Sequence, residues 1–395
     1  MEKRFIYTPV TNCIDNILRD IEIPLIFAEP LTGGLMLRSL KLLWYSFRKC
    51  RVPERGNENA IVRVVAASRL CVIPMTFYAV TIGGLISWIS GEFNPAIYLA
   101  LLAGFIGAHL LDNLINDYYD YKRGFDDPNY FRVLYGPHPL LDNIINIKSI
   151  ELFIILVFIY DLLLTVYLSI TVTPLIAILA AVGVLVMLLY AGIPIDAKRL
   201  GAGEILVAIV WGPVMVGGTI LAITGEHTAL QALVYAPFAI SVTLVLIGKH
   251  LDKYEQDSKK GIATLPVRLG LHATRRLASS LAIILPLMTV FTLAVYVKSF
   301  PALIPLASIP IAIYAYRILS REKPREAPPG WDVWPLWYVA GAYMVMDVVG
   351  RSTLASLLVY GLNIHGFTTT SWILLIMSVI FELYVGLKLF ASQKQ

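Results

Sequence analysis

Long apolar stretches dominate this chain and constrain its fold more than any other feature. Most of them approach or exceed the roughly 20 residues that a helix needs to cross a lipid hydrocarbon core. Only helices or closed barrels satisfy their backbone groups within lipid, and continuous apolar runs exclude the alternating pattern of a barrel. We therefore expect an all-α transmembrane bundle of about nine to ten spanning helices around a central cavity. The expected spans lie near residues 61–88, 95–118, 149–170, 174–191, 204–223, 229–249, 273–297, 300–319, 333–361 and 369–391.

The composition supports a membrane protein and narrows the function. Of the 395 residues, 57% are hydrophobic and 15% are charged, whereas about 25% of a soluble globular protein is charged. The net charge of +5 is modest and calls for no nucleic-acid partner. The chain has three cysteines (Cys13, Cys50 and Cys71) and no CxxC motif. We expect these cysteines to be structural, without a disulfide framework or a cysteine metal cluster.

Basic residues occur in every second loop between the expected spans. Lys and Arg gather in the loops near residues 119–148, 192–203, 250–272 and 320–332, while the intervening loops are short and nearly free of them. Because basic loops stay on the cytoplasmic side of a membrane, both termini and all the polar loops are expected there. This arrangement predicts an integral protein of the cell membrane whose active-site loops face the cytoplasm.

Three regions are expected along the chain. Residues 1–58 combine short apolar runs with basic residues, which predicts an N-terminal extension lying at the membrane interface. Residues 59–361 contain the main transmembrane domain, and residues 362–395 add one C-terminal transmembrane helix.

The second expected helix ends in a polar segment that carries the first candidate site. Four of its side chains recur at spacings of three and four: Asn113, Asn116, Asp117 and Asp120. Residues at these spacings share one face of a helix. Carboxylates that converge with amide oxygens make a site of the kind that Mg²⁺ binds together with substrate phosphates. Lys122 and Arg123 follow and can bind phosphate oxygens. A helix end whose charges merely face water remains an open alternative.

A second polar segment, residues 248–270, follows the sixth expected helix. Its acidic residues that can contribute to a second metal site are Asp252, Glu255 and Asp257. Its basic residues that can neutralise a diphosphate are Lys249, His250 and Lys253. Because both polar segments are expected on the same membrane face, they suggest two helix ends that clamp one polyanion.

Three segments, taken in order, resemble motifs of the UbiA superfamily of intramembrane prenyltransferases. Residues 116–126 (Asn-Asp-Tyr-Tyr-Asp-Tyr-Lys-Arg-Gly-Phe-Asp) resemble the first Asp-rich motif, in the form seen in the menaquinone-pathway branch. Residues 261–270 (Gly-Ile-Ala-Thr-Leu-Pro-Val-Arg-Leu-Gly) are similar to the tail of the second motif. Residues 190–213 resemble the loop and helix between the motifs. The resemblance covers about residues 61–360.

Two departures from the family pattern stand out. The second motif commonly reads Lys-Asp-x-x-Asp-Tyr-Glu-x-Asp, and this chain has His250 and Lys253 where two aspartates are expected. Asp252 lies one position away. The second metal site is therefore rebuilt, weakened or replaced by direct contacts of His and Lys with phosphate. The other departure is at residues 135–140, where relatives usually show an Arg-containing motif.

The resemblance implies transfer of a polyprenyl group from its diphosphate to an aromatic acceptor, most like 1,4-dihydroxy-2-naphthoate in menaquinone synthesis. It also implies Mg²⁺ as the cofactor, and membrane lipids around the protein. The implied metal ligands are Asp117, Asp120, Asp126, Asp252 and Asp257. The implied catalytic residues are Asn116, Asp117, Asp120 and Asp257. The implied substrate-binding residues are Asn113, Lys122, Arg123, Tyr190, Lys198, Arg199, Lys249, His250 and Asp252.

Other functions remain open at this stage. A geranylgeranyltransferase acting on geranylgeranylglyceryl phosphate would share the metal site and differ in its acceptor pocket. A transporter is the alternative from another class, but transporter sites usually lie at broken helices near the bilayer midplane. The candidate carboxylates of this chain instead cluster at helix ends. The departures at His250 and Lys253 also leave a non-catalytic relative open.

Overall fold

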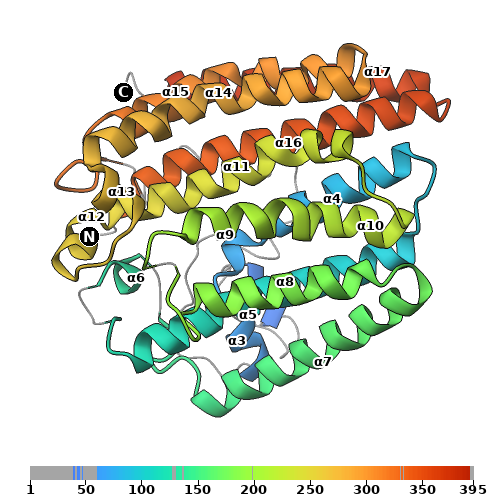
Figure 1. Cartoon of the computed structure of the whole chain (residues 1–395). Coiled ribbons are helices and arrows are strands. Elements are labelled where there is room, and N and C mark those ends of the chain that lie inside the picture. The colour runs from blue at the N-terminus through green and yellow to red at the C-terminus, as the bar shows by residue number, and fades with distance from the viewer. Residues whose placement is uncertain are drawn as a thin grey trace. The chain divides into compact units, whose positions relative to one another are not determined.

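A computed structural model of the chain is drawn in Figure 1, and its regular elements are helices. The structure describes residues 39–40, 42–44, 47, 60–126, 130–135, 138–197, 199–329, 331 and 333–391. The described part contains no strand. The expected all-α class is therefore confirmed. The predicted interfacial extension, residues 1–58, lies almost entirely outside the described residues.

Within the described residues, nine helices are long and apolar enough to cross a membrane. They are Leu70–Ile89 (η2 Leu70–Val72 and α4 Ile73–Ile89), α5 (Pro95–Lys122), α7 (Ile147–Thr171), Gly203–Thr224 (α9 Gly203–Ile209, η3 Val210–Gly217 and α10 Gly218–Thr224), α11 (Ala229–Asp252), α14 (Leu271–Val297), Phe300–Ser320 (η4 Phe300–Ser308 and α15 Ile309–Ser320), α16 (Tyr338–Ile364) and Thr368–Leu389 of α17 (Thr368–Ala391). The fourth expected span, 174–191, is present as a shorter apolar helix, α8 (Leu175–Tyr190).

The first expected span, 61–88, is broken rather than continuous. It consists of α3 (Ala60–Ala67) followed by η2 and α4, and Arg69 at the break has a left-handed backbone with φ of 62°. Pro74 explains the break, because a proline within a helix has no N–H to donate and its ring clashes with the preceding turn. A new helix that starts at Ile73 places this proline in the first turn, where it is tolerated.

The ninth expected span, 333–361, starts later than predicted, at Tyr338 in α16. Pro335 lies inside the predicted range, and it disfavours helical backbone at the preceding residue. The cysteines also differ from expectation, because Cys71 is disulfide-bonded. Cys13 and Cys50 lie outside the described residues.

The chain divides into two compact units. Unit 1 comprises residues 1–74, 106–162 and 325–335, and unit 2 comprises residues 75–105, 163–324 and 336–395. Unit 1 has an apolar core around Val64, Leu114, Leu140, Ile145 and Ile150. These residues come from α3, α5, the start of α7 and the loop before α7, so this core supports the end of α5.

Unit 2 is organised around α11, which packs against α9, η3, α14 and α16. Figure 1 shows α11 and α16 side by side. Gly248 allows this close packing, because a Cβ atom there would lie 2.7 Å from the carbonyl oxygen of Tyr338. Helices that approach closely at small residues are typical of membrane proteins. Through this contact the end of α11 meets the start of α16.

An ion-pair network lies within the apolar helices of unit 2. Arg351 of α16 donates from Nε to Glu382 of α17 at 2.8 Å and from a second nitrogen at 3.0 Å. The same guanidinium pairs with Asp347, one turn earlier on α16. Asp347 also accepts a 2.6 Å hydrogen bond from Tyr78 of α4. Ionisable side chains within a membrane are paired with one another, as these are.

Candidate functional site

The first polar segment forms the last turns of α5, and the structure buries three of its four predicted side chains. Asn113, Asn116 and Asp117 are buried, and Asp120 is half-buried one turn later. Lys122 and Arg123 are exposed. Lys122 donates a 3.2 Å hydrogen bond to the Tyr118 hydroxyl, and Arg123 stands over the ring of Tyr119. The buried residues therefore form the candidate site, and the two basic residues lie outside it.

Two arginines that the sequence analysis did not select bind Asp117. Arg132 donates from Nε to one carboxylate oxygen at 2.9 Å and from a second nitrogen to the other at 2.5 Å. Arg69 pairs with the same carboxylate. Bidentate pairs of this kind are among the strong hydrogen bonds in proteins. Asp117 therefore lies between two guanidinium groups.

The break between α3 and α4 positions Arg69. Its guanidinium donates a 3.2 Å hydrogen bond to the side-chain oxygen of Asn113, whose amide nitrogen donates to the Ser68 carbonyl at 3.1 Å. Burial by itself lowers the pKa of Arg69, but the neighbouring Asp117 carboxylate raises that pKa above its usual value. Arg69 is therefore permanently charged. Asn113, predicted to bind substrate, holds this arginine in the structure.

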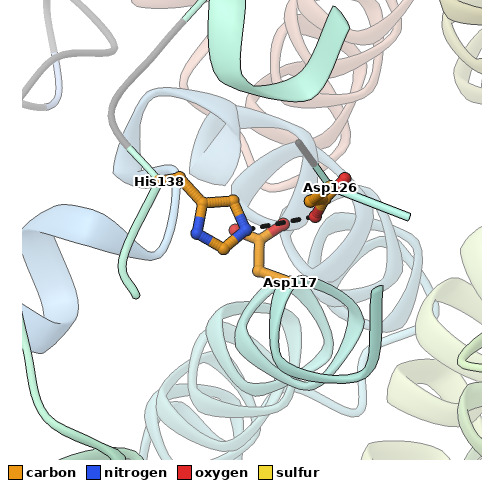
Figure 2. A group of neighbouring side chains, drawn as sticks. All are labelled: Asp117, Asp126 and His138. Carbon is orange, nitrogen blue, oxygen red and sulfur yellow. Dashed lines mark hydrogen bonds and ion pairs between the residues drawn. The ribbon is translucent and has the colours of Figure 1, made fainter. Parts of the chain in front are cut away.

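Asp126 and His138 form a second pair beside Asp117, as Figure 2 shows. His138 Nε2 lies 3.1 Å from one Asp126 oxygen, and both residues are buried. His138 Nδ1 accepts hydrogen bonds from the backbone N–H groups of Leu140 and Leu141. Because Nδ1 is an acceptor, the ring proton is on Nε2, which donates to Asp126. The other Asp126 oxygen, Oδ1, is buried and makes no hydrogen bond with the residues that the structure describes.

This cluster fits a metal ion that takes oxygen ligands. One ligand atom each from Asp117, Asp126 and His138 lies within 4.8 Å of the others. His138 Nε2 donates to Asp126 and both Asp117 oxygens accept from guanidinium groups, so the open ligand atom of this cluster is Oδ1 of Asp126, a carboxylate oxygen of the kind that suits Mg²⁺. The unpaired Oδ1 of Asp126 supports the assignment, because a buried oxygen without a partner is costly. Arg69, Arg132 and His138 were missed because nothing in their spacing along the chain links them to α5.

The second polar segment ends α11 and continues into α12 (Tyr254–Lys259). Asp252 binds the start of α16, accepting hydrogen bonds from the backbone N–H groups of Trp337 at 3.1 Å and Val339 at 2.9 Å. Lys323 pairs with the same carboxylate at 2.9 Å. A carboxylate at a helix N-terminus is stabilised by the unpaired N–H groups and by the helix dipole. These contacts favour a capping role for Asp252 over the predicted metal role.

Two further pairs occupy the second segment. His250 Nδ1 lies 2.8 Å from a carboxylate oxygen of Glu204, in the first turn of α9. Among the described residues, His250 Nε2 and the other Glu204 oxygen are buried and have no hydrogen-bond partner. Lys253 donates to Asp257 at 3.0 Å, and the Thr264 hydroxyl donates to the other Asp257 oxygen at 3.2 Å. The structure thus buries His250 and Asp257, while Glu255 is exposed and Lys249 is half-buried.

The loop between the motifs joins the tail of the second motif. The Arg199 carbonyl accepts a 3.0 Å hydrogen bond from the N–H of Ala263, and Arg268 donates to the Leu200 carbonyl at 2.5 Å. The Arg199 side chain pairs with Asp196 at 2.9 Å. Tyr190 ends α8 next to this loop. Lys198, a predicted phosphate contact, lies outside the described residues. The loop and the second motif belong to unit 2, and the first motif belongs to unit 1.

Comparisons with known proteins agree on one family. Residues 77–334 match the model of the UbiA prenyltransferase family. UbiA prenyltransferase domain-containing protein 1 of Mus musculus is 26% identical over 285 residues, covering 70% of this chain and 82% of that protein. The 1,4-dihydroxy-2-naphthoate octaprenyltransferase of Bacillus subtilis (strain 168) is 26% identical over 214 residues, covering 53% of this chain and 66% of that protein.

A similar solved structure is that of a UbiA homolog from Archaeoglobus fulgidus bound to GPP and Mg²⁺. It covers 72% of this chain and 99% of its own, at 17% sequence identity and a TM-score of 0.49.

Proposed function

The chain belongs to the UbiA prenyltransferase family, and on that premise we propose that it transfers a polyprenyl group from its diphosphate to an aromatic acceptor, with 1,4-dihydroxy-2-naphthoate as the acceptor. It is an integral membrane protein, because nine of its described helices can span a membrane and its family is one of membrane enzymes. The polar loops carrying the motifs are proposed to face the cytoplasm.

The main support for this proposal is the buried cluster of Asp117, Asp126, Arg69 and Arg132 at the end of α5. The two carboxylates and the two guanidiniums sum to a formal charge of zero. A bound Mg²⁺ would make the cluster strongly positive, and it would then attract a diphosphate. When bound, the metal supplies positive charge that stabilises the departing diphosphate as the allylic C–O bond breaks.

The residues of this cluster have distinct proposed roles. Asp117, Asp126 and Asp120 would hold the metal when it is bound, and the side-chain oxygen of Asn116 would assist them. Arg69 and Arg132 are proposed to bind phosphate oxygens, since a guanidinium suits phosphate as well as carboxylate. His138 orients Asp126 through its Nε2–H. These roles leave the unpaired oxygen of Asp126 directed to the metal.

The remaining predicted residues are assigned to the substrate. Lys249 and His250 at the end of α11, and Arg199 of the loop after α8, are proposed to bind the substrate. The apolar core beside α5, with Leu114 and Leu140, is proposed to keep water away from the polar cluster. Exclusion of water matters because water would otherwise capture the allylic cation. The electron pair of the broken C–O bond leaves with the diphosphate, and a ring carbon of the acceptor forms the new C–C bond. That carbon then loses the group it carried, a proton or, at the carboxylate-bearing carbon, CO2, which restores the aromatic ring.

The choice of acceptor rests on the relative from Bacillus subtilis, whose name specifies 1,4-dihydroxy-2-naphthoate. The test is turnover of radiolabelled geranylgeranyl diphosphate by the purified protein, with Mg²⁺ or EDTA. Dihydroxynaphthoate and geranylgeranylglyceryl phosphate are supplied in parallel. We expect a metal-dependent prenylated naphthoate, and no product from Asp126→Asn. Product from the glyceryl phosphate alone would overturn the aromatic acceptor, and absence of any product and of diphosphate binding would overturn the transferase.

A further inference from the structure

The second motif of this chain contains an ammonium group where its family resemblance expects a carboxylate. Lys253 occupies one of the two aspartate positions, and His250 occupies the other. Both side chains are buried, so neither is a surface charge. Buried charges in proteins are paired with each other or bind metal ions. The partners of these two residues therefore show whether the second motif pairs its charges within the protein or binds a metal ion.

The carboxylate of Asp257 already has its charge balanced by a lysine. Lys253 Nζ lies 3.0 Å from one oxygen of Asp257, and the other oxygen accepts from Thr264 at 3.2 Å. Lys253 lies at the junction of α11 and α12, and Asp257 follows one turn along, in α12, so local helix geometry fixes the pair. The Asp257 side chain is 0% exposed, which strengthens the interaction by excluding water. A metal ion at Asp257 would have to displace the ammonium.

The other acidic residue of the segment is occupied as well. Both oxygens of Asp252 accept backbone hydrogen bonds at the start of α16, and Lys323 balances its charge. Glu204 is hydrogen-bonded to His250. Over the described ranges, Asp117, Asp126 and His138 are the one group whose ligand atoms are close enough for a metal. The residues of the second motif thus do not fit the second metal ion that the family pattern implies.

We propose that the ammonium of Lys253 takes the place of the second metal ion at Asp257, so that this chain holds one divalent cation, at the first motif, and none at the second. This inference rests on the proposed function. The ammonium of Lys253 is present with or without metal. Metal binding to the chain should therefore follow the curve of a single site. With an aspartate in place of Lys253, the carboxylates of positions 253 and 257 would lie together without a cation and would require one.

The first test counts metal ions in the unmodified protein. Mn²⁺ binding is measured by electron paramagnetic resonance in the presence of an unreactive thiolo-diphosphate analogue of geranylgeranyl diphosphate. One bound Mn²⁺ per chain, abolished in Asp126→Asn, is the expected result. Two ions per chain would overturn the inference while leaving the proposed function intact. No bound Mn²⁺ would instead overturn the metal-dependent function on which the inference rests.

The second test changes Lys253. Lys253→Asp should gain a second Mn²⁺, and a folded variant that still binds one ion would contradict the proposal. Lys253→Met should keep one ion and lower the melting temperature in detergent, because it leaves the buried carboxylate of Asp257 without its charge partner. Lys259→Met is the matched control, since Lys259 is an exposed lysine at the end of α12, and it should change neither property. An unchanged melting temperature in Lys253→Met would overturn the role of this ammonium as the charge partner of Asp257.

Discussion

At the scale of single residues, His138 has a role that can be tested apart from the others, namely the orientation of Asp126. Its Nδ1 is held by two backbone N–H groups, and its Nε2 donates to Asp126. Residues that orient a metal ligand typically contribute about 10- to 100-fold to metal affinity. We predict that His138→Ala weakens Mn²⁺ binding by about tenfold. Glutamine can place an amide N–H near the position of Nε2, so His138→Gln should retain much of the affinity.

The comparison of these two variants distinguishes orientation from packing. If His138→Ala and His138→Gln lose Mn²⁺ affinity equally while both stay folded, the hydrogen bond to Asp126 is not what matters. The circular dichroism spectrum and the melting temperature in detergent serve as folding controls. Equal, undiminished affinity in both variants would remove His138 from the site altogether.

The residues of the site differ in how far the sequence predicts them. Asn113, Asn116 and Asp117 were found because helical periodicity is local, and the structure buries all three on α5. Arg69 lies 48 positions before Asp117 and reaches it from a helix break that Pro74 causes. Arg132 and His138 lie on the chain between α5 and α7. Loop residues have no periodicity, so their contacts depend on tertiary packing that one sequence does not display.

At the scale of helices and their ends, Asp252 is the informative residue. Its carboxylate binds two backbone N–H groups at the start of α16 and also Lys323. Removing it leaves these donors without their acceptor, at a cost of about 1–3 kcal/mol. We predict that Asp252→Ala lowers the melting temperature in detergent and leaves the number of bound Mn²⁺ ions unchanged.

Asp252→Asn provides the matched control, because its side-chain oxygen can still accept one of the hydrogen bonds. It should destabilise the protein less than Asp252→Ala. A variant with an unchanged melting temperature and a lost metal ion would support the metal role that the sequence suggested. The two measurements together therefore separate a helix cap from a ligand.

Helix existence was more predictable than helix ends. Apolar length alone predicts a membrane span, and every expected span has a helical counterpart in the described residues. The ends depend on prolines and on capping partners from other elements. Pro74 divides the first span, and Asp252 from α11 caps the start of α16. Such partners are distant in sequence and cannot be identified from the local pattern.

At the scale of the whole molecule, the network of Arg351 connects the C-terminal helix to the rest of unit 2. Glu382 of α17 is buried, and both its oxygens accept from Arg351. Breaking a buried pair leaves a charge without its partner, which costs about 3 kcal/mol. We predict that Glu382→Gln lowers the melting temperature in detergent. Lys388→Gln removes a charge at a half-buried position of the same helix, away from this network, and should have little effect. Equal melting temperatures for all three proteins would show that the network does not stabilise α17.

The orientation of the whole chain is the last property that the charges predict. Basic residues in alternate loops place the segment around Lys260 on the cytoplasmic side and the short loop at Glu92 on the opposite side. Fusions of alkaline phosphatase test this, because the enzyme is active only outside the cytoplasm. A fusion after Glu92 should be active, and a fusion after Lys260 should be inactive, with fluorescent-protein fusions giving the reverse. The opposite pattern would place both motifs outside the cytoplasm. Such a placement would be incompatible with a prenyl diphosphate supplied from the cytoplasm, because a charged diphosphate does not cross the membrane unaided.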